Sequence, residues 1–165
     1  MCLGGNAAQL AALVTGKVSA ANARTFVASL NANKVADSNA AAVAASNAIS
    51  FTQVASVKAG MGVGGNAEQL AALVAANVSA RNAPAVVTAG AVTIAQAQAV
   101  VAGLVVTGES QVQLKAIVSQ NVSSTNAQAF MQALVASSIT DEKSPAVLAA
   151  LVTASVSASN APDVV

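Results

Sequence analysis

The chain has 165 residues, of which 55% are hydrophobic, 8% charged and 2% aromatic, and its net charge is +1. A chain of this length fits one domain that can bury most of its apolar side chains, and a sequence so hydrophobic and so weakly charged is not expected to be disordered. The seven Lys and Arg residues form no basic cluster and few aromatic residues could stack on bases, so we expect no nucleic-acid partner.

The chain is built from an internal repeat. Residues 4–14 (GGNAAQLAALV) recur as residues 64–74 (GGNAEQLAALV), with one difference, Ala8 against Glu68. A shorter unit lies underneath, in which an apolar residue begins each segment and the next segment begins 14 to 17 residues later. These unit starts are Leu3, Val18, Val35, Ile49, Val63, Val78, Val92, Val106, Val122, Ile139 and Val156. We predict one repetitive domain over residues 1–165, made of the four-unit blocks 3–62 and 63–121 followed by 122–165.

Within the units the apolar residues have helical spacing. Ala23, Phe26, Val27 and Leu30 stand at i, i+3, i+4 and i+7, which places them on one face of an α-helix. Valine is frequent and favours strands, but the two-residue alternation of a half-buried strand is absent. Helices of about ten residues are marginal alone and must pack on their neighbours. The prediction is therefore all-α, an array of about ten short helices in an α-solenoid or a compact multi-helix bundle.

Polar and small residues mark the expected helix limits. N-caps are expected at Ser19, Ser79, Thr93, Ser123, Thr140 and Ser157, and C-terminal ends near Gly16, Asn33, Asn77, Gly108 and Asn121. The sequence does not decide where three of the helices start, because each contains a proline, which is tolerated only in the first turn of a helix. In the units of Pro84, Pro145 and Pro162, the cap is either the early Ser or Thr or a later residue, Asn82, Ser144 or Asn160. The expected buried residues are Leu13, Phe26, Val27, Leu30, Leu73, Val101, Leu104, Phe130, Leu134 and Leu151.

The sequence offers little for catalysis. It has no histidine, which removes the commonest general base and metal ligand, and Cys2 alone cannot form a zinc site. Asp141 and Glu142 are the only adjacent acids, and they suit the start of a helix. Residues 60–65 (GMGVGG) match the glycine pattern of dinucleotide-binding loops, but no acid follows about 20 residues later, so a junction between blocks is the simpler interpretation. We expect no enzyme, no catalytic residue, no cofactor and no metal.

Two features bear on the surroundings of the protein. Residues 83–108 carry no charge and are long enough to span a bilayer, but Thr, Gln and Gly90 interrupt them, so we expect no membrane span. Asn77 and Asn121 each begin an N-x-S sequon for glycosylation. We interpret each of these residues instead as closing one helix, while the Ser two residues later opens the next.

One segment resembles a known class of structural protein. Residues 126–135 (NAQAFMQALV), followed by Ile139-Thr140 and residues 147–152 (VLAALV), are similar to the helical repeat modules of spider silk proteins, which are helix arrays rich in Ala, Ser and Asn with few charges. This chain departs from them in having no long Ser runs and more Val. The resemblance implies an extracellular, fibre-forming protein and carries over no functional residue.

Both ends of the sequence resemble interior units. A helical-repeat array normally has terminal units with a polar outer face. The first unit keeps the interior apolar pattern with Leu10 and Leu13, and the last unit stops at Val164 and Val165, where its apolar cluster should begin. We predict that these four residues bind copies of the same chain in a fibre, filament or lattice. Two alternatives stay open, a carrier of a lipid or other apolar ligand between short helices and a monomeric helical scaffold that binds a partner protein.

Overall fold

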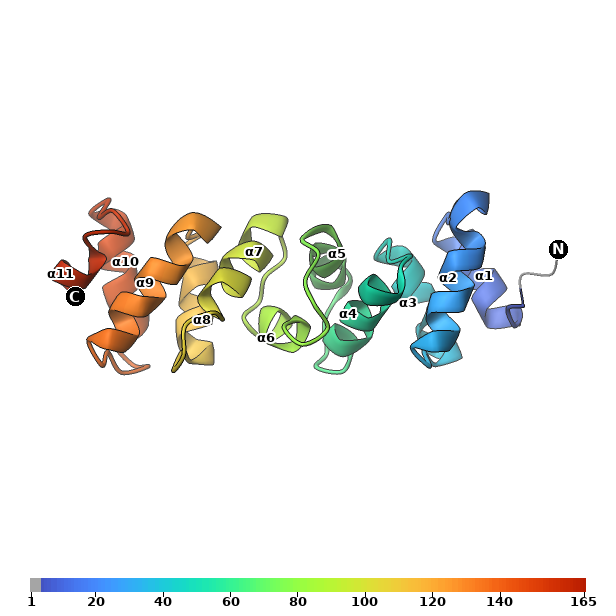
Figure 1. Ribbon diagram of the computed structural model, residues 1–165, viewed down its shortest axis with the longest axis horizontal. Helices are drawn as coiled ribbons and strands as arrows, with labels where there is room; N and C mark the ends of the chain where they lie inside the picture. Colours follow the sequence, from blue (N-terminus) through green and yellow to red (C-terminus); the bar gives the residue numbers. More distant parts are fainter. Residues whose placement is uncertain (1–3) are drawn as a thin grey trace. The chain divides into compact units, whose positions relative to one another are not determined.

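The computed structural model describes residues 4–165 of the chain (Figure 1). These residues form eleven α-helices and one short 3-10 helix, with no strand among them. The structure therefore confirms the prediction of an all-α fold with about ten short helices.

The helices form two compact units, of which the first ends at Val87 and the second begins at Thr88. The helices of the first unit are α1 (Ala7–Thr15), α2 (Ala20–Ala32), η1 (Asp37–Asn39), α3 (Ala40–Ala45), α4 (Phe51–Met61), α5 (Ala67–Ala75) and α6 (Ala83–Thr88). Those of the second are α7 (Ile94–Gly103), α8 (Gln111–Ser119), α9 (Ser124–Ala136), α10 (Ser144–Thr153) and α11 (Ala161–Val164).

A tight turn ends many of the helices and sets the length of the repeat. After α1, Lys17 has a φ of 51°, its N–H donates to the carbonyl of Val14, and the N–H of Val18 donates to the carbonyl of Leu13. This pair of bonds is the Schellman C-cap, in which one left-handed residue reverses the chain. The same arrangement recurs with left-handed residues at Lys34, Asn77, Asn121, Ser138 and Ser155. The apolar residue that begins each of these units therefore also closes the preceding helix.

Two of the expected helix ends are confirmed: Gly16 and Asn33 are the C-caps of α1 and α2. Both keep negative φ values, of −81° and −83°, and the left-handed residue is the Lys that follows each of them. Gly16 has a second role, because a Cβ there would come within 2.9 Å of the carbonyl carbon of Ala44. Glycine at this position therefore allows α1 and α3 to pack closely.

Capping boxes begin five of the helices, α1, α4, α5, α7 and α8. In each, an Asn, Ser or Thr side chain accepts the N–H of a Gln three residues later, and that Gln side chain accepts the N–H of the cap. The pairs are Asn6–Gln9, Ser50–Gln53, Asn66–Gln69, Thr93–Gln96 and Ser110–Gln113. Helices α2 and α9 begin after Ser19 and Ser123 as expected, although neither hydroxyl bonds to the helix.

The prolines delay the helix start in their units. The early carbonyls of Ser79, Thr140 and Ser157 accept an N–H three residues later and so form a turn, and the α-helix begins directly before each proline. Proline has no N–H to donate to the carbonyl four residues earlier, so the first helical bond is missing there. Asn160 is the N-cap of α11, as one of the two alternatives predicts, whereas Lys143 rather than Ser144 caps α10.

Each unit has its own apolar core. In the first unit α1 packs on α3, α2 on α4, and α4 on α5; in the second, α7 packs on α8 and α9, α8 on α10, and α9 on α11. Eight of the ten residues expected in the core are buried, but Val101 and Leu104 are only half-buried. Helix α7 ends at Gly103, which is buried and lies close to Leu114, and Leu104 is the C-cap. The buried face of α7 therefore ends at Gly103, one residue before the expected core residue Leu104.

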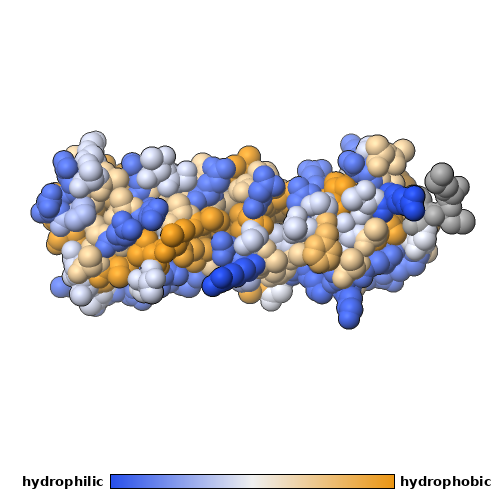
Figure 2. All heavy atoms as spheres, in the orientation of Figure 1, coloured by the Kyte–Doolittle hydropathy of each residue, from blue (hydrophilic) through white to orange (hydrophobic). Residues whose placement is uncertain are grey.

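The uncharged stretch of residues 83–108 is divided between two short helices, α6 and α7, with Gly90 in a left-handed turn between them. No helix in the described part of the chain is both long and apolar enough to cross a membrane. On the face shown in Figure 2, hydrophobic side chains lie among hydrophilic ones in each unit.

Candidate functional site

The helices with capping boxes bury the same position, with one exception. The fourth residue after each N-cap is Leu10, Val54, Leu70, Ala97 or Leu114. Four of these side chains are at most 3% exposed, but Leu10 of α1 is 39% exposed. Because the local helix is the same in all five, the difference lies in what covers it.

The eighth residue after the cap shows a stronger contrast with α5 and α8, whereas in α4 and α7 this residue is the exposed Lys58 and the half-buried Val101. Val14 of α1 is 80% exposed, whereas its counterparts Val74 in α5 and Val118 in α8 are 8% and 7% exposed. Val14 lies one turn after Leu10, so both belong to one face of α1. We call Leu10 and Val14 the open face of α1.

The preceding helix covers the equivalent leucine in each of the two interior copies. A Cβ on Gly60, near the end of α4, would lie 2.7 Å from a methyl carbon of Leu73 and 3.1 Å from one of Leu70. In the second unit, a Cβ on Gly103 at the end of α7 would lie 3.0 Å from a methyl carbon of Leu114. Helix α1 is the first helix of the described residues, and the elements on which it packs, α2, η1 and α3, all follow it.

The last described segment shows a second contrast of this kind. Residues 156–165 (VSASNAPDVV) repeat residues 78–87 (VSARNAPAVV) with two differences. Val164 is 62% exposed, whereas its counterpart Val86 is fully buried, and Val165 is half-buried where Val87 is buried. The C-terminal segment therefore also presents an apolar side chain that the interior copy covers.

The four predicted assembly residues differ in how exposed they are. Leu10 and Val164 lie on the surface, Val165 is half-buried, and Leu13 packs in the interior. Sequence reasoning missed Val14, the most exposed of the large apolar residues described. The sequence did contain a signal, because the eighth residue after the cap is Val in four of the five capping-box helices: Val14, Val74, Val101 and Val118.

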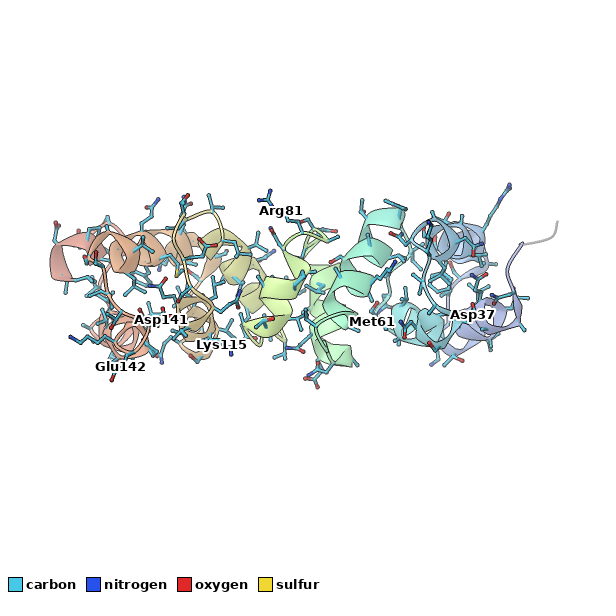
Figure 3. All side chains as sticks on the ribbon, turned by 90° about the horizontal axis from the view of Figure 1, so that it is seen from below. Asp37, Met61, Arg81, Lys115, Asp141 and Glu142 are labelled. Atoms are coloured by element: carbon cyan, nitrogen blue, oxygen red, sulfur yellow. The ribbon has the colours of Figure 1, made fainter. Side chains whose placement is uncertain are left out.

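Acidic side chains bridge helix starts rather than forming a catalytic pair. Asp37 accepts a hydrogen bond of 2.7 Å from the side-chain amide of Asn6, the N-cap of α1, and Asp141 accepts one from the hydroxyl of Ser110, the N-cap of α8. Figure 3 shows both acids on the ribbon, with Glu142 pointing outward. Within residues 4–165 no group of three His, Cys, Asp or Glu side chains comes together that could hold a metal.

The glycine-rich junction is a helix end. Gly64 has a φ of 81°, and the N–H of Gly65 donates to the carbonyl of Gly60 at 3.0 Å. A dinucleotide-binding loop would instead follow a strand. Cys2, the one thiol of the sequence, lies outside the described residues.

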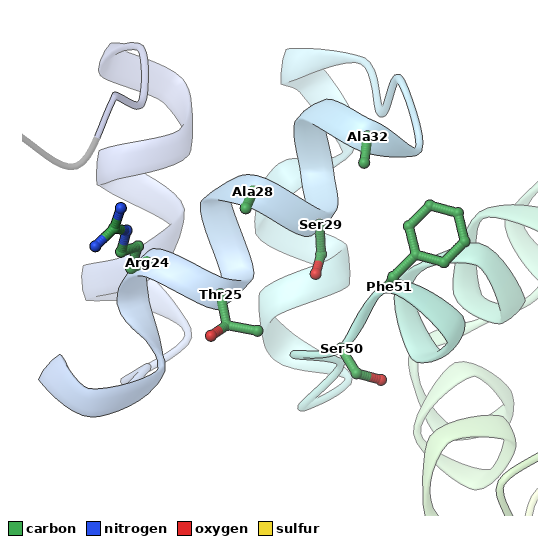
Figure 4. Close-up of a pocket in the computed structure, with 7 residues that line it drawn as sticks. All are labelled: Arg24, Thr25, Ala28, Ser29, Ala32, Ser50 and Phe51. Carbon is green, nitrogen blue, oxygen red and sulfur yellow. The ribbon is translucent and has the colours of Figure 1, made fainter.

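An open groove lies between α2 and the start of α4 (Figure 4). It has a volume of about 470 Å³, and its lining is mainly apolar. Phe51 stands at one end and is 55% exposed, and Arg24 lies at the other. The groove could take an extended apolar group.

Comparisons with protein-family models, with curated proteins and with solved structures found no match.

Proposed function

We propose that this protein is a non-catalytic structural protein that assembles with copies of itself into a fibre, filament or lattice. The observation that carries the proposal is the open face of α1, where Leu10 and Val14 are exposed although the same residues are covered in the interior copies. Apolar side chains gain free energy when another surface removes them from water. The resemblance to silk modules supports an extracellular fibre as the setting.

The composition supports association in a second way. A net charge of +1 provides almost no electrostatic repulsion between copies. Only 8% of the residues are charged, so few charged groups would have to be desolvated at a contact. Uncovered apolar faces on such a chain favour self-association.

Light scattering coupled to size separation tests this proposal. The double variant Leu10→Lys/Val14→Lys places two charges on the open face, and because both residues are exposed the helix content should not change. Its association should be at least about tenfold weaker than that of the original chain. Val105→Lys is the matched control, since Val105 is 67% exposed but lies outside the open face. A chain that stays monomeric at high concentration and neutral pH contradicts the proposal.

The groove between α2 and α4 favours a second candidate, a carrier of a lipid or other apolar ligand. Its volume suits one acyl chain or a small apolar molecule, and the exposed Phe51 ring would gain most from cover. Native mass spectrometry of the purified chain would show such a ligand as added mass. Ala28→Glu, which places a charge in the groove, should abolish it. A monomer without added mass favours the remaining alternative, a scaffold for a partner protein.

A further inference from the structure

We infer that the open face of α1 binds the C-terminal segment of a second copy, residues 156–165, so that copies join head to tail. The inference rests on the proposed function and specifies its partner surface. The competing arrangement joins two open faces of α1 to each other.

The order of helices along the chain supports this pairing. Helices α8, α9 and α10 repeat α1, α2 and α3 at an offset of 104 residues: the N-caps Asn6 and Ser110 match, and so do the acids Asp37 and Asp141 that bond to them. In helix order α11 follows α10 as α4 follows α3, and α11 packs on α9 as α4 packs on α2. The helix that follows α4 is α5, the near-identical copy of α1, and in that pair α4 covers Leu70. We therefore pair α11 of one copy with α1 of another.

The exposed side chain of α11 stands where the repeat buries one. Val164 is the seventh residue after Ser157, and the seventh residue after the equivalent Ser19, Ser79 and Ser123 is buried in each case: Phe26, Val86 and Phe130. Both the first and the last described helices thus present one apolar surface that the repeat elsewhere covers. One head-to-tail contact would cover both.

The charges of the two segments are complementary. Residues 4–23 contain one charged side chain, Lys17, where the interior copy has the neutral Asn77. Residues 156–165 contain one charged side chain, Asp163, where the interior copy has Ala85. Both are exposed, and each lies within three residues of the apolar side chain concerned, Val14 or Val164. Opposite charges at the rim favour the head-to-tail pairing, whereas two α1 faces would carry the same charge.

A contact between two different surfaces leaves each copy with one free surface of each kind. Such a heterologous contact continues into a filament, or closes into a ring if the rotation between copies allows it. Blocking one surface of a copy leaves its other surface competent. Two chains blocked at opposite surfaces should therefore still bind each other.

This complementation is the decisive experiment. Val14→Lys blocks the open face and Val164→Lys blocks α11, and both residues are exposed in the single chain. Each variant alone should associate at least about tenfold more weakly than the original chain. An equimolar mixture should form a one-to-one dimer and nothing larger, as measured by light scattering. Val105→Lys should assemble like the original chain, and circular dichroism should show the same helix content in all.

The other outcomes separate the inference from the proposed function. If Val14→Lys is monomeric while Val164→Lys assembles normally, the α1 faces pair with each other and the inference is wrong, although self-assembly stands. A mixture of two impaired variants that stays monomeric also overturns the head-to-tail contact. If the original chain is monomeric, or if neither change weakens assembly, the proposed function itself fails at this surface.

A charge exchange gives a second readout. Lys17→Glu and Asp163→Lys should each slow or weaken assembly, and the double variant should recover it because the opposite charges are restored. Two paired α1 faces would show no recovery from the change at Asp163. The single effects should shrink as salt is added, since exposed charges are screened.

Discussion

Leu10 and Leu70 occupy the same position of two helices that differ at few residues, so the same substitution at each isolates the effect of the covering helix. Leu70 is 3% exposed beneath α4, and Leu70→Ala should cost about 2–5 kcal/mol because it removes buried surface and leaves a cavity. Leu10 is 39% exposed. Leu10→Ala leaves no closed cavity, so it loses only the transfer free energy of its buried part, at about 0.8 kcal/mol per buried methylene. The free energy of unfolding should therefore fall by about 1–1.5 kcal/mol.

Urea unfolding followed by circular dichroism measures both losses. The two residues lie in the same compact unit, so one transition reports on both. For a denaturant slope of about 2 kcal/mol per molar, the midpoints of the two variants should differ by about 0.25–2 M at low protein concentration. At high concentration the loss at Leu10 should approach that at Leu70, because assembly covers the open face. Equal losses in the dilute chain would refute the reasoning, since Leu10 would then already be covered.

Three further substitutions test the packing and the turns. Phe130→Ala should lower the free energy of unfolding by about 3–5 kcal/mol because its ring is buried, whereas Phe51→Ala should cost below about 1 kcal/mol because that ring is mostly exposed; denaturant titration would compare them. Lys34→Gly should stabilise the fold by about 0.5–1 kcal/mol and so raise the thermal midpoint, because Lys34 is left-handed with a φ of 52°. An unchanged midpoint would show that the backbone is not strained there. Gly16→Ala should cost about 1–3 kcal/mol by forcing α1 away from Ala44, and a gain in stability measured by the same titration would contradict this close packing.

Sequence patterns predicted much of the local structure. The helical spacing around Phe26 predicted α2 and its buried face, and Asn77 and Asn121 were correctly assigned to helix ends. These features depend on bonds between residues three to five positions apart, so the nearby sequence contains the information. The capping boxes were missed at Asn6, Ser50, Asn66 and Ser110, although a Gln three residues later is visible in each case.

Packing between helices decided other local details. Gly16 was correctly placed at the end of α1, but the left-handed residue of that turn is Lys17, and Gly16 lies where α1 approaches Ala44. Extrapolating the helical face of α7 placed Leu104 inside, whereas the close approach of α8 and α9 falls on Gly103. Both details depend on contacts between helices, α1 with α3 and α7 with α8 and α9.

At the candidate site, the local structure follows from the sequence, but the exposure of its side chains follows from the tertiary structure. Residues 4–14 and 64–74 are nearly identical and form the same capped helix, so the sequence by itself determined the helix, its cap and its apolar face. It did not determine that Val74 is covered while Val14 is 80% exposed. Burial belongs to a residue together with its neighbours in space, and only the packing of the other helices decided which of the two equal faces remained open.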